Sequence, residues 1–383
     1  MSVTAAQGFT AAGVPAGLKS TGAPDVAVVV NQGPSTAAAA VFTSNRCKAN
    51  PVLWSEQAIQ GGSAVAVAIN SGGANCYTGT EGFATTHRTA EAVAEHLGVG
   101  AVDVQVCSTG LIGMLNDREA LLSGVRSALE GQSPDGGHAA ATAIMTTDSV
   151  AKEAVAQGDG FTVGGMAKGA GMLAPALATM LVVITTDADV DSATADAALR
   201  SATAQTFDRL DSDGCQSTND TVLLMASGAR GTTPDPEAFT AAVTEVCHDL
   251  AMQLLADAEG ADHEIAIEVV NAASVDDALE VGRSVARSNL FKCAIFGKDP
   301  NWGRILASVG TTQAAFDPAD LDVALNDVWV CRNSGPGESA DAIDLEARSV
   351  TVTIDLKSGD ASGTIWTNDL TQAYVHENSA YSS

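Results

Sequence analysis

The sequence predicts an α/β protein in which β-sheets lie between layers of helices. Strand-like and helix-like segments alternate along the chain on both sides of residue 179. Residues 180–186, MLVVITT, are apolar without polar alternation, which is typical of a strand covered on both faces. A chain of 383 residues is long enough for one large core or for two packed lobes. Together these observations indicate sheets sandwiched between helical layers.

The N-terminal half alternates between short strands and helices. Period-2 alternation predicts early strands, separated by clusters of Gly, Pro and Asn, over 25–30, 37–42 and 64–70. A further strand, 103–110, ends in a Gly turn, and helical spacing predicts helices over 87–97 and 117–130. Asn116 or Asp117 is the expected cap of the second helix, and the Ala-rich residues 139–145 fit a short helix or a strand.

The C-terminal half continues the same alternation. Helices are predicted over 191–207, 237–258 and 274–288. Strands are predicted over 180–186, 264–270, 350–356 and 363–370, and an exposed loop over 333–341. No internal repeat or low-complexity linker interrupts this pattern.

The charge balance limits the classes of partner. Lys and Arg number 19 against 46 Asp and Glu, which gives a formal net charge of −27. Such an acidic protein repels phosphate backbones and anionic membranes, so we expect neither a nucleic-acid nor a membrane role. No apolar run reaches the roughly 18 residues of a membrane helix. The first twenty residues lack the cationic and apolar regions of a secretion signal, so we expect a cytoplasmic protein.

The Cys and His pattern predicts neither a metal site nor a disulfide framework. The seven Cys are scattered without a C-x-x-C pair, and the six His are dispersed. Residues 164–171, GGMAKGAG, depart from the phosphate-binding G-x-x-x-x-G-K-[ST] pattern. Residues 208–220 have Arg209 where a calcium loop needs its first ligand, so we reject a calcium site there.

Thr179 stands where a flexible Gly/Pro stretch meets the apolar strand. A hydroxyl is a weak nucleophile unless a base lies beside it. Cleavage of the Ala178–Thr179 bond would give Thr179 a free α-amine, whose ordinary pKa of about 7.7–8 suits a general base. Gly169, Gly171 and Pro175 supply a turning approach to that bond. The alternative from spacing alone is that Thr179 merely begins a strand, where Thr is common.

The residues around Thr179 resemble a known processing segment. Residues 164–188, GGMAKGAGMLAPALATMLVVITTDA, resemble that of the ornithine acetyltransferase (glutamate N-acetyltransferase) family. Eight further segments resemble the family in the same order: VFTSNRCKANPV (41–52), NSGGANCYTG (70–79), CSTGLIG (107–113), IMTTDS (144–149), SDGCQSTNDT (212–221), DAEGA (257–261), AIFGKDPNWGR (294–304) and YVHENSAYSS (374–383). The resemblance therefore covers essentially the whole chain.

The resemblance implies an αββα sandwich of the self-processing N-terminal-nucleophile type. It implies cleavage between Ala178 and Thr179 into an alpha chain, 1–178, and a beta chain, 179–383, which stay together as a heterotetramer. The implied reaction moves an acetyl group from N2-acetyl-L-ornithine to L-glutamate by a ping-pong mechanism through acetyl-Thr179, without a metal or organic cofactor. Acetyl-CoA as a second donor, and arginine synthesis against a specialised pathway, both stay open.

Site roles carry over residue by residue. Thr179 matches the nucleophile, and Thr109 and Gly110 match the pair that forms the oxyanion hole. The substrate-contacting positions are Thr146, Lys168, Thr179, Glu259, Asn378 and Ser383. This chain departs from the family pattern at Asn50, where Ala is usual, and at Asp262 and His263, where a Lys is usual nearby.

Two other functions are consistent with the implied fold or with the position of Thr179. The implied fold also resembles that of aminopeptidases that process themselves to an N-terminal Ser, so a hydrolase is the first alternative. The second is an uncleaved binding or structural protein in which Thr179 only begins a strand. A comparison of acetyl transfer to glutamate with release of free acetate distinguishes the hydrolase from the acetyltransferase. A denaturing gel distinguishes an uncleaved protein, which gives one band, from a cleaved one, which gives two shorter fragments.

Overall fold

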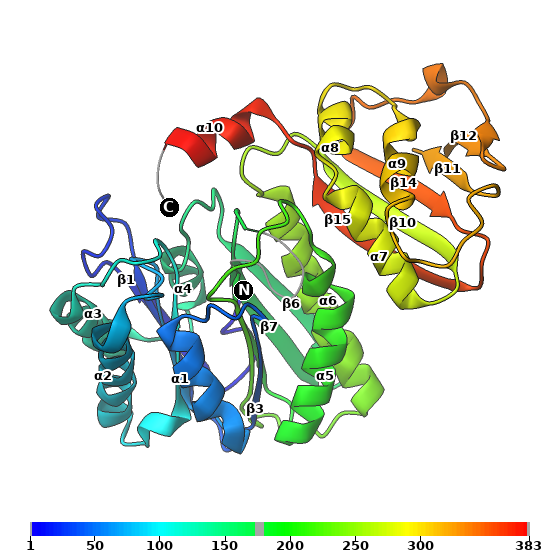
Figure 1. Ribbon diagram of the computed structural model, residues 1–383. Helices are drawn as coiled ribbons and strands as arrows, with labels where there is room; N and C mark the ends of the chain where they lie inside the picture. Colours follow the sequence, from blue (N-terminus) through cyan, green and yellow to red (C-terminus); the bar gives the residue numbers. More distant parts are fainter. Residues whose placement is uncertain (1, 173–179, 381–383) are drawn as a thin grey trace.

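The computed structural model describes residues 2–172 and 180–380, which fold into two lobes (Figure 1). The first, the sandwich lobe, comprises the described residues up to 258. The second lobe comprises residues 264–368. Helix α10 (Gln372–Ala380) follows the second lobe and leads back over the sandwich lobe (Figure 1).

Two sheets form the centre of the sandwich lobe. The first has the order β1 (Phe9–Val14), β2 (Val26–Asn31), β4 (Ala66–Asn70), β5 (Val104–Ser108), with β4 and β5 parallel. The second has the order β3 (Ala38–Phe42), β9 (Thr221–Ala226), β8 (Leu181–Thr186), β7 (Phe161–Lys168), β6 (Lys152–Gly158). In the second sheet β8 and β9 are parallel and β7 is antiparallel to β8.

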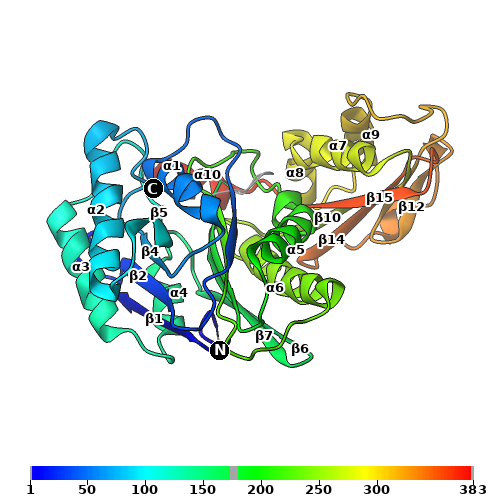
Figure 2. The same ribbon diagram turned by 90° about the horizontal axis from the view of Figure 1, so that it is seen from below.

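The sheets pack face to face and helices cover their outer faces. Val29 and Ile69 of the first sheet share one apolar cluster with Met166, Val183 and Leu223 of the second. Helices α2 (Gly79–Leu97) and α3 (Arg118–Gly131) cover the first sheet, and α5 (Ser192–Gln205) and α6 (Pro236–Ala256) cover the second. Figure 2 shows these four layers in order. The predicted αββα sandwich is confirmed.

Strand β8 contributes to two apolar clusters, one on each face of its sheet. Leu181 and Val183 lie in the cluster between the sheets, whereas Val182 and Ile184 pack toward α5 and α6. Successive side chains of a strand point to opposite faces, so an apolar run without alternation is buried twice. Each fully buried side chain of this kind contributes roughly 1.5–3 kcal/mol. The prediction that 180–186 is covered on both faces is confirmed for the strand's described residues.

The remaining helices of the sandwich lobe lie at its edges. Helix α1 (Asn50–Ala58) contacts β5, and α4 (Gly137–Ala143) contacts β1 and β2. Asp117 caps α3 by accepting a hydrogen bond from the Ala120 N–H at 3.1 Å, as predicted. Helix α2 begins at Gly79, eight residues before the predicted start at 87.

The second lobe has its own sheet and its own core. Its sheet order is β13 (Gly335–Pro336), β12 (Val328–Arg332), β11 (Asp322–Leu325), β14 (Ser349–Asp355), β10 (Glu264–Ala272), β15 (Ala361–Asn368). Helices α7 (Val275–Ala286), α8 (Asn289–Phe296) and α9 (Trp302–Val309) complete it, and α7 packs on β10 and β15. The sequence predicted several of these elements but not their separation into a second unit.

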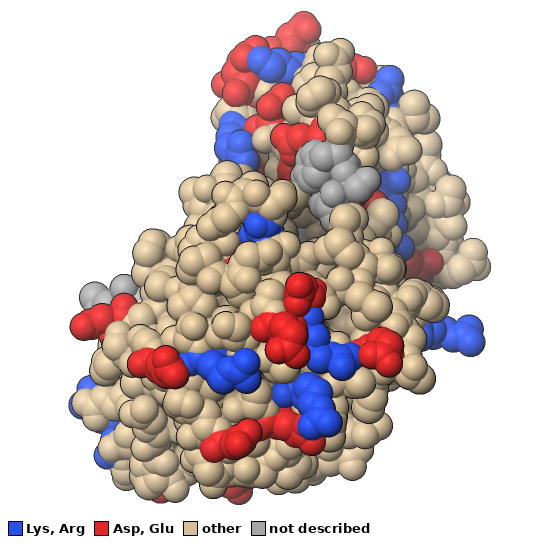
Figure 3. Space-filling model, turned by 90° about the vertical axis from the view of Figure 1, so that its left-hand side faces the viewer, with Lys and Arg blue, Asp and Glu red and all other residues tan. Residues whose placement is uncertain are grey.

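The surface around α2 and α3 mixes charges of both signs. Figure 3 shows basic side chains between acidic ones on this face. Arg88 pairs with Glu91 at 2.7 Å, and Arg118 pairs with Glu81 at 2.9 Å. This face therefore offers a phosphate backbone no continuous basic surface. Across residues 2–172 and 180–380, we find no helix with the length and hydropathy to cross a membrane.

Candidate active site

One pocket of about 510 Å³ gathers every predicted site residue that the structure describes. Residues from five separate parts of the chain line it together: Thr109, Gly110, Thr146, Lys168, Glu259 and Asn378. Ala178, Thr179 and Ser383 lie outside the described residues. Segments far apart in the sequence thus converge on one cavity of a size that suits a small molecule.

Thr109 and Gly110 follow β5 and form one wall of this pocket. The Thr109 N–H donates to the Asn70 carbonyl at 2.9 Å, and its Oγ1 accepts from Lys168 Nζ at 3.2 Å. A hydroxyl that accepts one hydrogen bond still has its own hydrogen to donate. Among the described residues, nothing accepts from the Gly110 N–H. The pair can therefore offer two hydrogen-bond donors to a ligand oxygen.

Position 110 requires glycine. Its φ of +123° lies in the left-handed region, and an added Cβ would stand 3.0 Å from the Cα and N of Gly73. The turn after β5 therefore depends on the absence of a side chain. That turn is what brings the Gly110 N–H to the pocket.

Lys168, the last residue of β7, is buried in a network of charged groups. Burial lowers the pKa of Lys168, and the nearby Asp148 carboxylate partly offsets this effect. Burial would raise the pKa of Asp148, but Lys168 and Lys152 outweigh it and bring the value to about 2. The ionised Asp148 accepts from Lys152 Nζ at 2.7 Å, and from the N–H groups of Gly169 at 2.6 Å and Thr146 at 2.9 Å. It thus holds the Thr146 turn against the end of β7.

The same network positions Glu259. Lys152 Nζ also donates to Asp257 at 2.5 Å, two residues before Glu259. The Glu259 N–H donates to the Ala170 carbonyl at 2.9 Å, and its Oε2 accepts from Asn378 Nδ2 of α10 at 3.0 Å. A Cβ on Gly171 would lie 2.7 Å from Glu259 Oε2, so a larger residue there would displace the Glu259 carboxylate. Glu259 is half-buried and carries its carboxylate into the pocket wall.

A loop before β9 ties the two halves of the site together. Asn219 Nδ2 donates to the carbonyls of Ala74 and Ser108, each at 2.7 Å, at the end of β5. The next residue, Asp220, accepts from the Met180 N–H at 3.0 Å. Neighbouring residues thus hold the strand that leads to Thr109 and the first described residue after Thr179.

Sequence reasoning assigned no role to Asn219, Asp220, Asp148 or Lys152. Residues 212–221 and 144–149 resemble the family, and the calcium loop considered over 208–220 is rejected. Burial is what distinguishes these polar residues, and polar residues are mostly exposed in proteins. A polar pattern in a sequence does not by itself indicate which of its members are buried.

The departures from the family pattern lie away from the pocket. His263 is buried with Nδ1 2.7 Å from Asp369 Oδ2 and Nε2 3.1 Å from the Leu345 carbonyl oxygen. Asn50 donates to Thr78 Oγ1 at 2.9 Å, at the start of α1. Neither side chain lines the 510 Å³ pocket. Their contacts account for both residues as parts of the fold.

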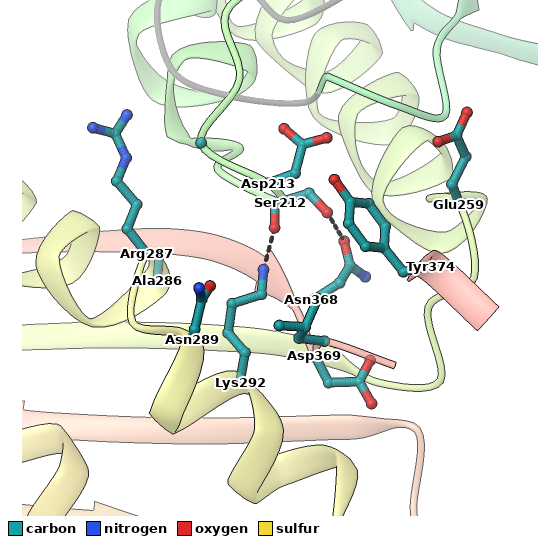
Figure 4. Close-up of a pocket in the computed structure, with 12 residues that line it drawn as sticks. Ser212, Asp213, Glu259, Ala286, Arg287, Asn289, Lys292, Asn368, Asp369 and Tyr374 are labelled. Carbon is teal, nitrogen blue, oxygen red and sulfur yellow. Dashed lines mark hydrogen bonds between the residues drawn. The ribbon is translucent and has the colours of Figure 1, made fainter. Parts of the chain in front are cut away.

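A second pocket, of about 190 Å³, also includes Glu259 in its lining (Figure 4). Lys292 of α8 donates to the Ser212 carbonyl and, at 3.2 Å, to Thr367 Oγ1. Ser212 Oγ donates to Asn368 Oδ1 at 2.7 Å. The next residue, Asp213, accepts from the Met172 N–H at 2.7 Å. This inter-lobe pocket thus joins the second lobe to the end of the first described segment.

No cluster suited to a metal is found within 2–172 and 180–380: no three His, Cys, Asp or Glu side chains lie together in such an arrangement.

Comparison with known proteins places the chain in a family. The ArgJ family matches residues 10–383. The arginine biosynthesis bifunctional protein ArgJ of Streptomyces coelicolor is 62% identical over 383 residues, which is 100% of both chains. Its namesake from Mycobacterium leprae is 53% identical over 389 residues, covering 100% of this chain and 96% of that one.

A crystal structure of ornithine acetyltransferase complexed with ornithine, from Mycobacterium tuberculosis, is 54% identical to the matched part. The match covers 45% of this chain and 94% of that chain, with a TM-score of 0.45. The family match and the full-length relatives show that the chain belongs to the ArgJ family of bifunctional arginine biosynthesis enzymes.

Proposed function

We propose that this chain is a self-processing acetyltransferase that moves the acetyl group of N2-acetyl-L-ornithine to L-glutamate. The observation that carries the proposal is the convergence of Thr109, Gly110, Thr146, Lys168, Glu259 and Asn378 on one pocket. Family membership supports the reaction class. The products are L-ornithine and N-acetyl-L-glutamate, and we propose a cytoplasmic enzyme without a cofactor.

The nucleophile of the proposal is Thr179 after cleavage of the Ala178–Thr179 bond. Thr179 Oγ attacks the acetyl carbonyl of N-acetylornithine while its own α-amine takes the hydroxyl proton. The C–N bond breaks, and ornithine leaves with that proton on its α-nitrogen. The α-amine of glutamate then attacks the acetyl-threonine ester and restores the free hydroxyl. This is a ping-pong reaction because the first product leaves before the second substrate reacts.

Thr109 and Gly110 would stabilise the oxyanion of both tetrahedral intermediates. The Thr109 hydroxyl can donate because its oxygen already accepts from Lys168. The Gly110 N–H is the second donor. Removal of one such donor typically costs about 10²–10³ in kcat.

The charged groups of the pocket suit an amino-acid substrate. We assign Glu259 to the side-chain ammonium of ornithine, because its carboxylate lines the pocket and Asn378 orients it at 3.0 Å. We assign Lys168 to a substrate carboxylate, as a buried cation in an acidic protein. Thr146, Asn378 and Ser383 would supply the remaining polar contacts.

The sheet topology supports a stable assembly of the two proposed fragments, 1–178 and 179–383. Strand β8 of the second fragment pairs with β7 of the first from Val163↔Thr186 to Lys168↔Leu181. Strand β3 of the first pairs with β9 of the second. Cleavage would therefore leave fragments that share one sheet. We propose two copies of each in a heterotetramer. Acetyl transfer from acetyl-CoA to glutamate is the assay for a second donor.

The test combines a gel, N-terminal sequencing and an activity assay. We expect the wild type to give two fragments, one beginning Thr-Met-Leu-Val, and to form N-acetylglutamate from N-acetylornithine and glutamate. Thr179→Ala should give one band near 38.6 kDa and no transfer. Thr179→Ser, which keeps a hydroxyl, is the matched control and should retain part of both activities.

Two results would contradict the proposal. Thr179→Ala that transfers acetyl groups at the wild-type rate would rule out Thr179 as nucleophile. A wild-type enzyme that releases mainly free acetate in the presence of glutamate would support the hydrolase instead.

A further inference from the structure

Asp220 is a buried carboxyl group that the proposed transfer reaction does not use. Its side chain is fully buried, immediately before β9. One oxygen, Oδ1, accepts from the Met180 N–H at 3.0 Å. The other, Oδ2, has no hydrogen-bond partner among the described residues. An unpartnered buried polar atom costs about 1–3 kcal/mol and calls for an explanation.

The position of Asp220 along the sheet suggests that explanation. Strands β8 and β9 are parallel and in register from Leu181↔Thr221 onward, so Asp220 lies beside Met180. Met180 is bonded to Thr179, whose own nitrogen belongs to the bond proposed for cleavage. Consecutive backbone nitrogens lie no more than about 3.7 Å apart. The scissile nitrogen is therefore one residue from an atom that the carboxyl group already contacts.

We infer that Asp220 is the acid that protonates the Thr179 nitrogen when the chain cuts itself. This inference rests on the proposed function, because it concerns the cleavage that creates the nucleophile. Asp220 accepts the Met180 N–H through one oxygen and delivers a proton from the other.

The step balances without a co-reactant other than water. Thr179 Oγ attacks the Ala178 carbonyl carbon, the C–O bond forms, and the C–N bond breaks. The departing nitrogen takes the proton of Asp220, and the Thr179 hydroxyl proton returns to the carboxylate. Water then hydrolyses the ester, which leaves the Ala178 carboxyl group and a free Thr179 hydroxyl. An amine is a poor leaving group unless it is protonated, so a placed acid should matter.

The surroundings of Asp220 favour the protonated form. Burial raises the pKa of Asp220 well above its usual range. The Met180 N–H and the Lys168 ammonium offset this only in part. Lys168 is the charged group that faces Asp220, and Asp148, Lys152 and Glu259 surround Lys168 in turn.

The decisive variant is Asp220→Asn. Asparagine has nearly the same shape and can still accept the Met180 N–H, but its amide N–H is not acidic enough to protonate the leaving nitrogen. The time course of fragment appearance on a denaturing gel, in a cell-free synthesis reaction, compares the variant with the full-length wild type. We expect Asp220→Asn to cleave at least about a hundredfold more slowly, at the low end of general acid catalysis.

The matched control is Asp211→Asn. Asp211 is also buried and also has one unpartnered oxygen, but it pairs with Arg287 rather than with Met180. It should cleave at the wild-type rate. As a second variant, Asp220→Ala leaves space for a small acid, and added formate should restore part of its cleavage whereas chloride should not.

The outcomes separate this inference from the proposed function. If Asp220→Asn is cleaved as fast as the wild type, Asp220 is not the acid, and Thr179 can still be the nucleophile. Should Asp220→Asn fail to fold, Asp220→Ala without rescue by formate would overturn it. A wild type that is never cut would instead refute the self-processing proposal itself.

Discussion

The two pockets that share Glu259 use buried lysines in different ways. In the 510 Å³ pocket, Lys168 donates to Thr109 Oγ1 and leaves the Thr109 hydroxyl hydrogen for a ligand. In the 190 Å³ inter-lobe pocket, Lys292 donates to the Ser212 carbonyl and to Thr367 Oγ1 (Figure 4). The first lysine supports a group that faces a cavity, whereas the second joins two lobes.

A buried charge therefore marks a functional site only through the groups that it contacts. Burial lowers the pKa of both lysines. A perturbed pKa alone would therefore rank the two pockets together, since structural networks shift pKa values as active sites do. The donors left by Thr109 and Gly110 are what distinguish the larger pocket. Substitutions in the two pockets should accordingly differ in their effect on acetyl transfer.

The largest effect is expected at Thr109. Thr109→Val keeps the shape of the side chain but removes the hydroxyl donor, so kcat should fall by about 10²–10³. Acetyl transfer should be measured on protein whose cleavage has been verified by gel. Thr109→Ser keeps the hydroxyl and should retain most of the activity. A Thr109→Val enzyme within threefold of wild type would remove the oxyanion role from this residue.

An intermediate effect is expected at Glu259, in the lining of both pockets. Glu259→Gln keeps the size and the acceptor for Asn378 but loses the charge that we assign to the ornithine ammonium. The KM for N-acetylornithine should rise about tenfold, the effect of roughly 1.4 kcal/mol of binding, while kcat changes little. Steady-state kinetics with both substrates varied gives the two constants.

Glu264→Gln is the control for this comparison. Glu264 pairs with Arg348 and lines neither pocket, so its loss should leave both constants unchanged. If Glu259→Gln lowers kcat and spares KM, then Glu259 does not act in ground-state binding.

The sequence predicted the layered fold better than the site. Strand β8 was predicted because its apolar run is long enough to show burial on both faces. Strand β7, its neighbour, was missed because Gly164 and Gly165 weaken a strand pattern. The structure explains Gly164: an added Cβ would stand 2.4 Å from the Ser2 carbonyl oxygen. Close packing against the N-terminal segment thus requires a glycine, and this glycine weakens the strand pattern in the sequence.

The site could be assembled from the sequence only through family resemblance. Thr109 and Lys168 are 59 positions apart, and Glu259 and Asn378 are 119 apart, yet each pair is hydrogen-bonded. No local pattern encodes such contacts, because the packing of whole sheets and of α10 creates them. Asn219 and Asp220 needed the structure as well, since only their burial distinguishes them from ordinary loop residues.

The smallest effect on acetyl transfer is expected at Lys292, where stability should respond instead. Burial lowers the pKa of Lys292 to about 8 from 10.5. Between these values the unfolded chain binds more protons than the folded one, so this lysine makes stability rise with pH. Lys292→Met should abolish that rise, which amounts to about 3 kcal/mol at most. Transfer should stay within threefold of wild type, because Lys292 does not line the larger pocket.

Urea unfolding from pH 7 to pH 10 measures this contribution in the Thr179→Ala background, where we expect a single chain. The free energy of unfolding of the parent minus that of Lys292→Met should increase through this range. Lys298→Met, at an exposed lysine of the same lobe, is the control and should follow the parent. A difference that is flat with pH would mean that folding does not lower the pKa of Lys292, so that its ammonium stays charged in the folded protein through this range. A loss of transfer well beyond threefold would show instead that the inter-lobe pocket belongs to the active site.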